Sequence, residues 1–130
     1  MTLETALRAY TLADAAVAAQ VGTRMYPRKL PQNPTLPALV YQRVDTRRLH
    51  VMEGPDGLPR ARMQITAWAS SVSGLEGTTE AVRERLDGFA GAWGDLYVGA
   101  CLCVAERDLD DPETGRVGVA QDYMIQFEEV

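Results

Sequence analysis

The sequence contains little of what catalytic and metal-binding sites are usually built from. Its 130 residues include a single histidine, His50, and two cysteines, Cys101 and Cys103. These three side chains are one ligand short of a structural zinc site, and the two cysteines are too few for a disulfide framework. The chain also lacks a G-x-S-x-G turn, a phosphate-binding loop and an H-E-x-x-H motif. We therefore expect no enzyme activity, no metal and no cofactor.

Long apolar runs are missing as well. The longest one, Leu96–Ala105, is about half as long as a helix that crosses a bilayer. The first residues include Glu4 and Asp14, and no basic segment precedes their apolar part, so we expect neither a signal peptide nor membrane contact. A chain with two cysteines and no leader is typical of synthesis in a reducing cytoplasm.

Positive charge is in deficit, and its distribution is uneven. The net charge is −5, which argues against a protein that grips nucleic acid through its phosphates. Residues 1–62 hold nine Lys and Arg against five Asp and Glu, whereas residues 63–130 hold four against thirteen. This split is compatible with ordinary solvated faces, or with a basic and an acidic face that meet on neighbouring copies of the chain.

Three segments have the pattern of helices. Thr2 is a suitable N-cap for a helix whose face carries Leu3, Leu7 and Tyr10. A second helix over 15–21 ends at Gly22, so the start of the chain is two short helices or one kinked helix. A capping box at 73–76 opens a third helix, which Gly88, Gly91 and Gly94 end.

Four segments have the pattern of strands, namely 38–44, 60–69, 96–106 and 117–128. Between the first two lies a turn signal at Glu53–Gly57. We expect a single α+β domain over 1–130, with an antiparallel sheet of about four strands and helices packed on one face. A long hairpin arm at about 46–60 extends from it, and an acidic loop at 107–115 precedes the last strand.

Candidate functional residues fall into three groups. The acidic loop is a solvated turn, a contact surface for a basic partner, or a metal site, although its spacing is not that of a calcium loop. Trp68 lies on the polar side of its strand, which favours burial in an interface. The expected interface residues are Arg43, Arg47, Arg48, His50, Arg60, Arg62, Trp68, Asp108, Asp110, Asp111 and Glu113.

The order of several short segments over nearly the whole chain resembles the tail completion, or tail terminator, family of long-tailed phages and gene-transfer particles. The segments that carry this resemblance are Leu3–Ala9, Ala13–Ala19, Val21–Pro27, Leu36–Gln42, Gly54–Leu58, Arg62–Ala69, Ala81–Phe89, Glu106–Leu109 and Pro112–Gly115.

The resemblance implies a structural virion protein, assembled in the host cytoplasm, that forms a ring, usually of six subunits. The ring would cap the head-proximal end of the tail tube, end tube polymerisation and contact the head–tail connector, while DNA passes through its bore without specific binding. Such a ring needs a head-to-tail interface that closes. The alternatives are a head-side stopper or adaptor, a small α+β enzyme or ligand-binding domain, and a DNA-binding module.

Overall fold

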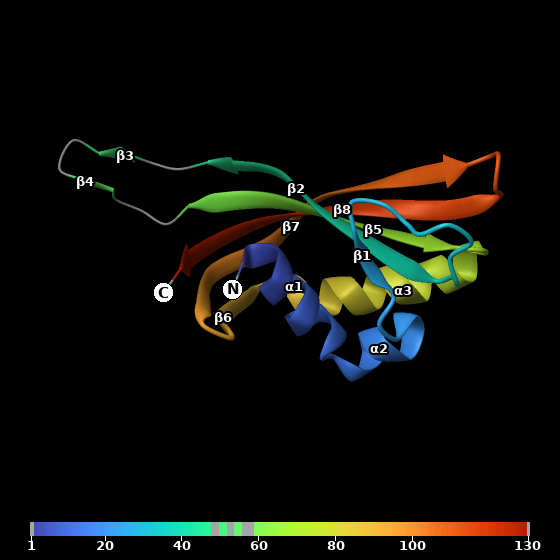
Figure 1. The fold of residues 1–130 in the computed structure, drawn as a ribbon, viewed down its shortest axis with the longest axis horizontal. Helices are drawn as coiled ribbons and strands as arrows, with labels where there is room; N and C mark the ends of the chain where they lie inside the picture. Colours follow the sequence, from blue (N-terminus) through green and yellow to red (C-terminus); the bar gives the residue numbers. More distant parts are fainter. Residues whose placement is uncertain (1, 48–49, 52–53, 56–58, 130) are drawn as a thin grey trace.

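The computed structural model describes residues 2–47, 50–51, 54–55 and 59–129, and these form a sheet with helices on one face (Figure 1). The sheet has six strands in the order β1-β2-β5-β8-β7-β6. Its strands are β1 (Met25–Pro27), β2 (Ala38–Arg47), β5 (Arg60–Ala69), β6 (Phe89–Trp93), β7 (Leu96–Asp111) and β8 (Arg116–Glu129). The expected α+β class with helices on one face is thereby confirmed.

The expected number of about four strands was too low, because two short strands were not recognised. β1 pairs parallel to β2, so the sheet is mixed rather than wholly antiparallel. It is only three residues long and ends in Pro27, which makes its alternation too short to detect. β6 contains Gly91 and two alanines, so its sequence was interpreted as the end of the preceding helix.

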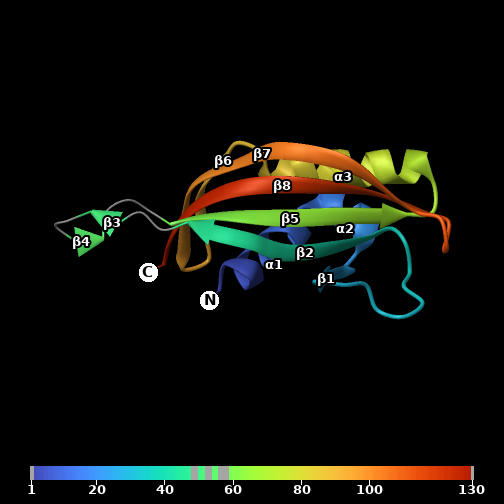
Figure 2. The same cartoon turned by 90° about the horizontal axis from the view of Figure 1, so that it is seen from above.

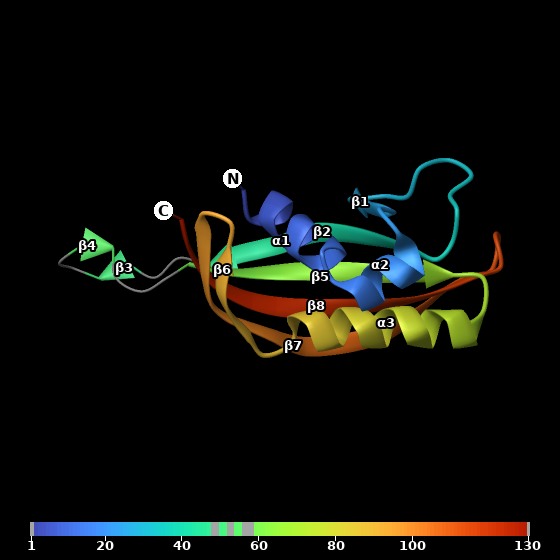
Figure 3. The same cartoon turned by 90° about the horizontal axis from the view of Figure 1, so that it is seen from below.

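The three helices lie side by side beneath the sheet, as Figure 3 shows from below. They are α1 (Leu3–Leu12), α2 (Ala15–Val21) and α3 (Val72–Leu86). Thr2 caps α1 by accepting a hydrogen bond from the Thr5 N–H, as predicted, and two separate helices form at the start of the chain. None of the described helices is long and apolar enough to cross a membrane.

The start of α3 differs from the expectation. The N-cap is Ser71, whose Oγ accepts a hydrogen bond from the Gly74 N–H at 3.3 Å. The expected capping box at 73–76 therefore lies inside the first turn of the helix. Ser71 and Ser73 are both residue types that favour an N-cap. Ser71 is the N-cap because it follows β5 in an extended conformation, which an N-cap residue needs.

The acidic segment is also different, because most of it is strand rather than loop. The β7–β8 ladder continues to the pair Asp111↔Arg116, which leaves only a four-residue turn at 112–115. Gly115 has a φ of +75° there, and its N–H donates to the Asp111 carbonyl. Asp108, Asp110 and Asp111 thus lie on β7, and only Glu113 lies in the turn.

The core lies between the helices and the sheet. Alternate residues of β5, from Ala61 to Ala69, face the helices and are buried, as the alternation predicted. Leu7, Tyr123 and Phe127 fill the centre and are fully buried. Burying one large apolar side chain contributes roughly 1.5–3 kcal/mol, so this face provides most of the stability of the fold.

Beyond one end of the sheet lies the hairpin arm, in which β3 (His50–Val51) pairs with β4 (Gly54–Pro55) (Figure 1). β2 and β5 lead into the arm from the pair Arg47↔Arg60. Arg48, together with 49, 52–53 and 56–58, lies outside the described residues. The side chain of His50 is likewise outside what the structure describes.

Candidate functional site

The face of the sheet opposite the helices carries no helix, and we call it the open face (Figure 2). Its side chains come from the alternate residues of β2, β5, β8 and β7 that do not face the core. On β5 these residues are Arg60, Arg62, Gln64, Thr66 and Trp68. Trp68 therefore lies on the side that its sequence position indicated, and it is half-buried without any helix above it.

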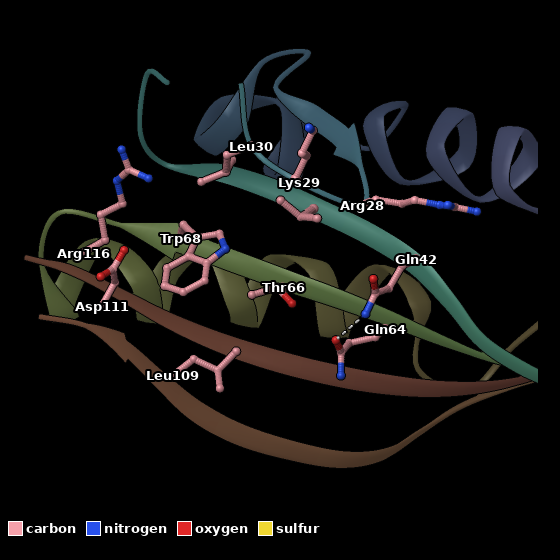
Figure 4. Close-up of a pocket in the computed structure, with 11 residues that line it drawn as sticks. Arg28, Lys29, Leu30, Gln42, Gln64, Thr66, Trp68, Leu109, Asp111 and Arg116 are labelled. Atoms are coloured by element: carbon pink, nitrogen blue, oxygen red, sulfur yellow. Dashed lines mark hydrogen bonds between the residues drawn. The ribbon is translucent and has the colours of Figure 1, made fainter. Parts of the chain in front are cut away.

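One end of the open face is hollowed around Trp68 (Figure 4). The hollow has a volume of about 310 Å³ and lies between Trp68 and the segment that follows β1. Its lining residues are Arg28, Lys29, Leu30, Val40, Gln42, Gln64, Thr66, Trp68, Leu109, Asp111 and Arg116. Besides the indole, the lining has three aliphatic side chains, three cations, one carboxylate and three neutral polar side chains.

Gly118 shapes this hollow by letting the indole lie against β8. A Cβ at position 118 would be 2.7 Å from Cε3 of Trp68 and 3.1 Å from the Leu109 carbonyl oxygen, so any larger residue would push the ring away. Glycine within a strand marks such a close approach. The sequence analysis did not identify the contact between Gly118 and Trp68. A glycine inside an otherwise regular strand pattern was the signal that could have indicated it.

A polar row crosses the middle of the open face. The Asp122 side chain is only 4% exposed, and it accepts hydrogen bonds from Arg62 at 2.7 and 3.0 Å. Gln64 donates to the other oxygen of Asp122 at 3.1 Å and accepts from Gln42 at 3.2 Å. The row joins β2, β5 and β8, and because every bond is made within the chain, it stiffens the face rather than forming a reactive group.

The other end of the open face has an apolar groove of about 340 Å³, lined by Arg60, Ala100, Leu102, Val104, Met124 and Gln126. Leu102 is 50% exposed and Val104 is 49% exposed. Val44 lies away from this groove, at a β-bulge of β2, and its side chain is also 49% exposed. Exposed aliphatic side chains clustered on one surface mark an interaction surface more often than a solvated one.

The structure separates the predicted arginines from the predicted carboxylates. Arg47 and Arg60 lie at the end of the sheet that leads into the arm, whereas Asp111 and Glu113 lie at the opposite end, beside the turn before β8. Because the two groups lie at opposite ends of the sheet, these arginines can contact these carboxylates only between two copies of the chain.

Two of the predicted interface arginines already have partners within the chain. Arg43 forms a two-pronged ion pair with Glu4 of α1, with its closest contact at 2.7 Å, and Arg62 pairs with Asp122. The carboxylate of Asp111 also has a partner within the chain. It forms a hydrogen bond with the Thr114 side chain, and this bond lowers the pKa of Asp111. These pairs position side chains on the surface, and their role in an interface remains a prediction.

The two cysteines face the helices. Burial raises the pKa of Cys101 to about 12, with the charge of Asp87 adding to the shift, and burial also raises the pKa of Cys103. Both thiols stay protonated near neutral pH and provide no nucleophile. Within the described ranges, no group of three or more His, Cys, Asp or Glu side chains is placed to hold a metal ion.

Comparison with known proteins decides the family. The sequence profile described as "Tail completion protein gp17" matches residues 5–128. The chain belongs to this tail completion family. Membership makes it a non-enzymatic structural protein of the virion, associated with the tail.

The fold of this chain is also present among solved structures. A chain from the structure titled "Virion of native gene transfer agent (GTA) particle" superposes with a TM-score of 0.81 at 16% sequence identity. The match covers 97% of this chain and 94% of that chain, so the likeness extends over nearly the whole of both chains. A search of curated proteins found no match.

Proposed function

We propose that the chain is a tail terminator, which forms a ring at the head-proximal end of the tail tube. In this role the ring ends tube polymerisation and joins the tail to the head connector. The observation that carries the proposal is the family match over residues 5–128. Its partners are further copies of itself, in a ring of six, the tail tube protein and the connector protein of the head.

The form of the molecule supports an assembly role. One face of the sheet is filled by helices, and the other carries a hollow, an apolar groove and a satisfied polar row. The arm beyond the sheet adds a surface that reaches away from the body (Figure 1). A protein with an apolar groove beside exposed Leu102 and Val104, together with an extended arm, is suited to bind large partners rather than small substrates.

The charge of the chain supports the passage of DNA through the ring. Each phosphate that binds a Lys or Arg side chain releases counterions and strengthens binding, so unpaired cations would slow the DNA. The net charge is −5, and Arg43 and Arg62 are neutralised by Glu4 and Asp122. The bore is therefore expected to let DNA slide without specific contacts.

The deciding experiment removes the gene and examines the particles by electron microscopy. We expect filled heads together with unjoined or abnormally long tails, and we expect the protein to co-purify with tails in the wild type. Normal joined particles in the deletion strain would contradict the proposal. Co-purification with filled heads in place of tails would instead assign the protein to the head side of the joint.

A charge-reversal variant tests the contribution of the acidic end. We expect Asp110→Lys/Asp111→Lys to join tails poorly at low salt and to be least impaired at high salt, where repulsion is screened. The matched control is Glu80→Lys/Glu84→Lys, which makes the same charge change on exposed positions of α3. Full joining at low salt by the first variant would show that these carboxylates do not lie in the interface.

A further inference from the structure

Two long strands each leave part of one edge without a neighbouring strand. β2 pairs with β1 only through Leu39–Tyr41, so its part from Gln42 to Arg47 has β5 on one side alone in the described structure. β7 pairs with β6 only up to Cys101, so among the residues that the structure describes Leu102–Asp111 has only one neighbouring strand, β8. An unpaired edge presents a row of backbone N–H and C=O groups to another chain.

The hydrogen bonds of β2 show which of its backbone groups face outward. Leu39 donates to the Arg24 carbonyl, and the Tyr41 carbonyl accepts from Arg28, so these residues point away from β5. Residues alternate along an antiparallel ladder, and the bulge between Arg43 and Asp45 inserts one extra residue. Arg43 and Thr46 therefore direct their backbone groups to the free edge.

The hydrogen bonds of β7 likewise show which of its backbone groups face outward. The Cys101 carbonyl accepts from Gly88, and the Cys103 N–H donates to Asp87, so both point away from β8. After the bulge between Cys103 and Ala105, the alternation resumes with Glu106, Asp108 and Asp110 facing outward.

The topology sets the relative direction of the two free edges. From β2 through β5 and β8 to β7 there are three antiparallel steps, so β7 runs opposite to β2. A second copy, rotated about an axis to which the strands are tilted by about 35–45° as in barrels, keeps its own strand directions and is offset along them. Its β2 then lies antiparallel to β7 of the first copy, and repeating the rotation closes a ring.

The two free edges also differ in charge. Segment 42–47 has two arginines and one aspartate, and Arg43 is paired with Glu4 of α1. Segment 102–111 has four carboxylates and one arginine. The carboxylates repel a second edge of the same kind, which disfavours pairing of β7 with β7 and leaves the edge of β2, with Arg47, as the favoured partner.

We propose that, in the ring on which the proposed function rests, Gln42–Arg47 of one copy pairs as an antiparallel strand with the Leu102–Asp111 edge of the next copy. The sheets of successive subunits then form one continuous sheet around the ring. This pairing requires a stagger, because β6 covers the part of β7 before Leu102, and β1 covers β2 up to Tyr41. A stagger between strands is also what closing a sheet into a barrel demands.

The first test compares two substitutions at Asp108. Asp108→Ala removes the carboxylate but keeps the outward N–H, whereas Asp108→Pro removes both. Proline is tolerated on the free side of an edge strand, so both variants should keep the circular dichroism spectrum of the wild type. We expect wild type and Asp108→Ala to form rings on isolated tail tubes, and Asp108→Pro to lose at least tenfold in ring occupancy by electron microscopy.

A disulfide cross-linking test detects the pairing of β2 with β7 of the next copy and does not need the Asp108→Pro variant. In a Cys103→Ala background, Thr46→Cys is combined in turn with Glu106→Cys, Asp108→Cys or Asp110→Cys. Paired strands bring opposite Cα atoms to about 5.5 Å, which suits a disulfide. We expect one of the combinations to give covalent oligomers on non-reducing gels. The control, Thr46→Cys with Val72→Cys on α3, should give none.

The outcomes separate this proposal from the proposed function. Rings of wild type and of Asp108→Pro alike, with no cross-linked combination, would overturn the edge pairing and leave the ring intact. Absence of rings from the wild type itself, on tubes that are competent for joining, would overturn both. An Asp108→Pro chain that fails to fold leaves the decision to the cross-links.

Discussion

The two faces of the sheet differ in how each is completed. Residues on the covered face, such as Met63 and Ile125, are buried against helices, so this face is complete within one chain. The open face has a hollow at one end and exposed Leu102 and Val104 at the other, and its central polar row is hydrogen-bonded within the chain. The covered face therefore determines folding, and the open face, with the edges beside it, is available for assembly.

The largest difference between the two faces should appear when leucine is truncated on each. Leu7→Ala empties a fully buried site and should lower the free energy of unfolding by about 2–5 kcal/mol. Leu102→Ala changes a half-exposed side chain and should lower it by less than about 0.5 kcal/mol. Urea unfolding followed by circular dichroism measures both, and equal losses would remove the distinction.

A smaller effect is expected from Gly118→Ala on the open face. The added methyl group displaces the Trp68 indole, which should lower the free energy of unfolding by about 1–3 kcal/mol and change the near-ultraviolet circular dichroism. The control is Gly77→Ala in α3, where the new methyl group meets only the Gln20 side chain and should raise stability by up to about 1 kcal/mol. An unchanged near-ultraviolet spectrum in Gly118→Ala would mean that the indole does not lie over β8.

Alkaline pH should weaken the covered face. The pKa of Cys101 rises from an ordinary value of 9.0 to about 12 in the folded chain, because burial disfavours the thiolate. The unfolded chain loses this proton first, so stability is full below pH 9 and falls as pH rises toward 12. We expect a loss of about 1 kcal/mol between about pH 8.5 and 10, and a smaller loss in Cys101→Ala. Identical pH profiles of the two proteins would contradict this assignment.

The smallest effect is expected where an ion pair is exposed. Arg83 of α3 contacts Glu106 of β7 at 3.0 Å, and this contact raises the pKa of Arg83. Because both side chains are well solvated, Glu106→Gln should leave the urea midpoint unchanged within error. A clear drop in the midpoint would show that this edge of the sheet contributes to folding.

The sequence predicted best those elements whose pattern is local. The ten-residue alternation of β5 and the helix over Ala15–Val21 between Asp14 and Gly22 were predicted with the bounds that the structure shows. The extent of β7 could not be predicted, because Asp108 and Asp110 have low strand propensity and only their pairing with β8 makes them strand.

The candidate site was harder to predict than the fold. The side on which Trp68 lies follows from alternation alone. The hollow around it also needs Leu30 from the segment after β1, Leu109 from β7 and the missing side chain of Gly118. These residues lie far apart in the sequence, and only the strand order brings them together. The partners of Arg43 and Arg62 were unpredictable for the same reason.

The acidic edge of β7 has a further consequence for the newly made chain. β7 and β8 are joined by a four-residue turn, so their hairpin closes a short loop and costs less chain entropy than the pairing of β2 with β5. This hairpin is also the last part of the sheet to be synthesised, so the edge of β7 stays exposed from its formation until another chain pairs with it. Charged residues on such an edge act as gatekeepers against aggregation. We therefore expect Glu106, Asp108 and Asp110 to protect the free subunit against aggregation before it joins other copies.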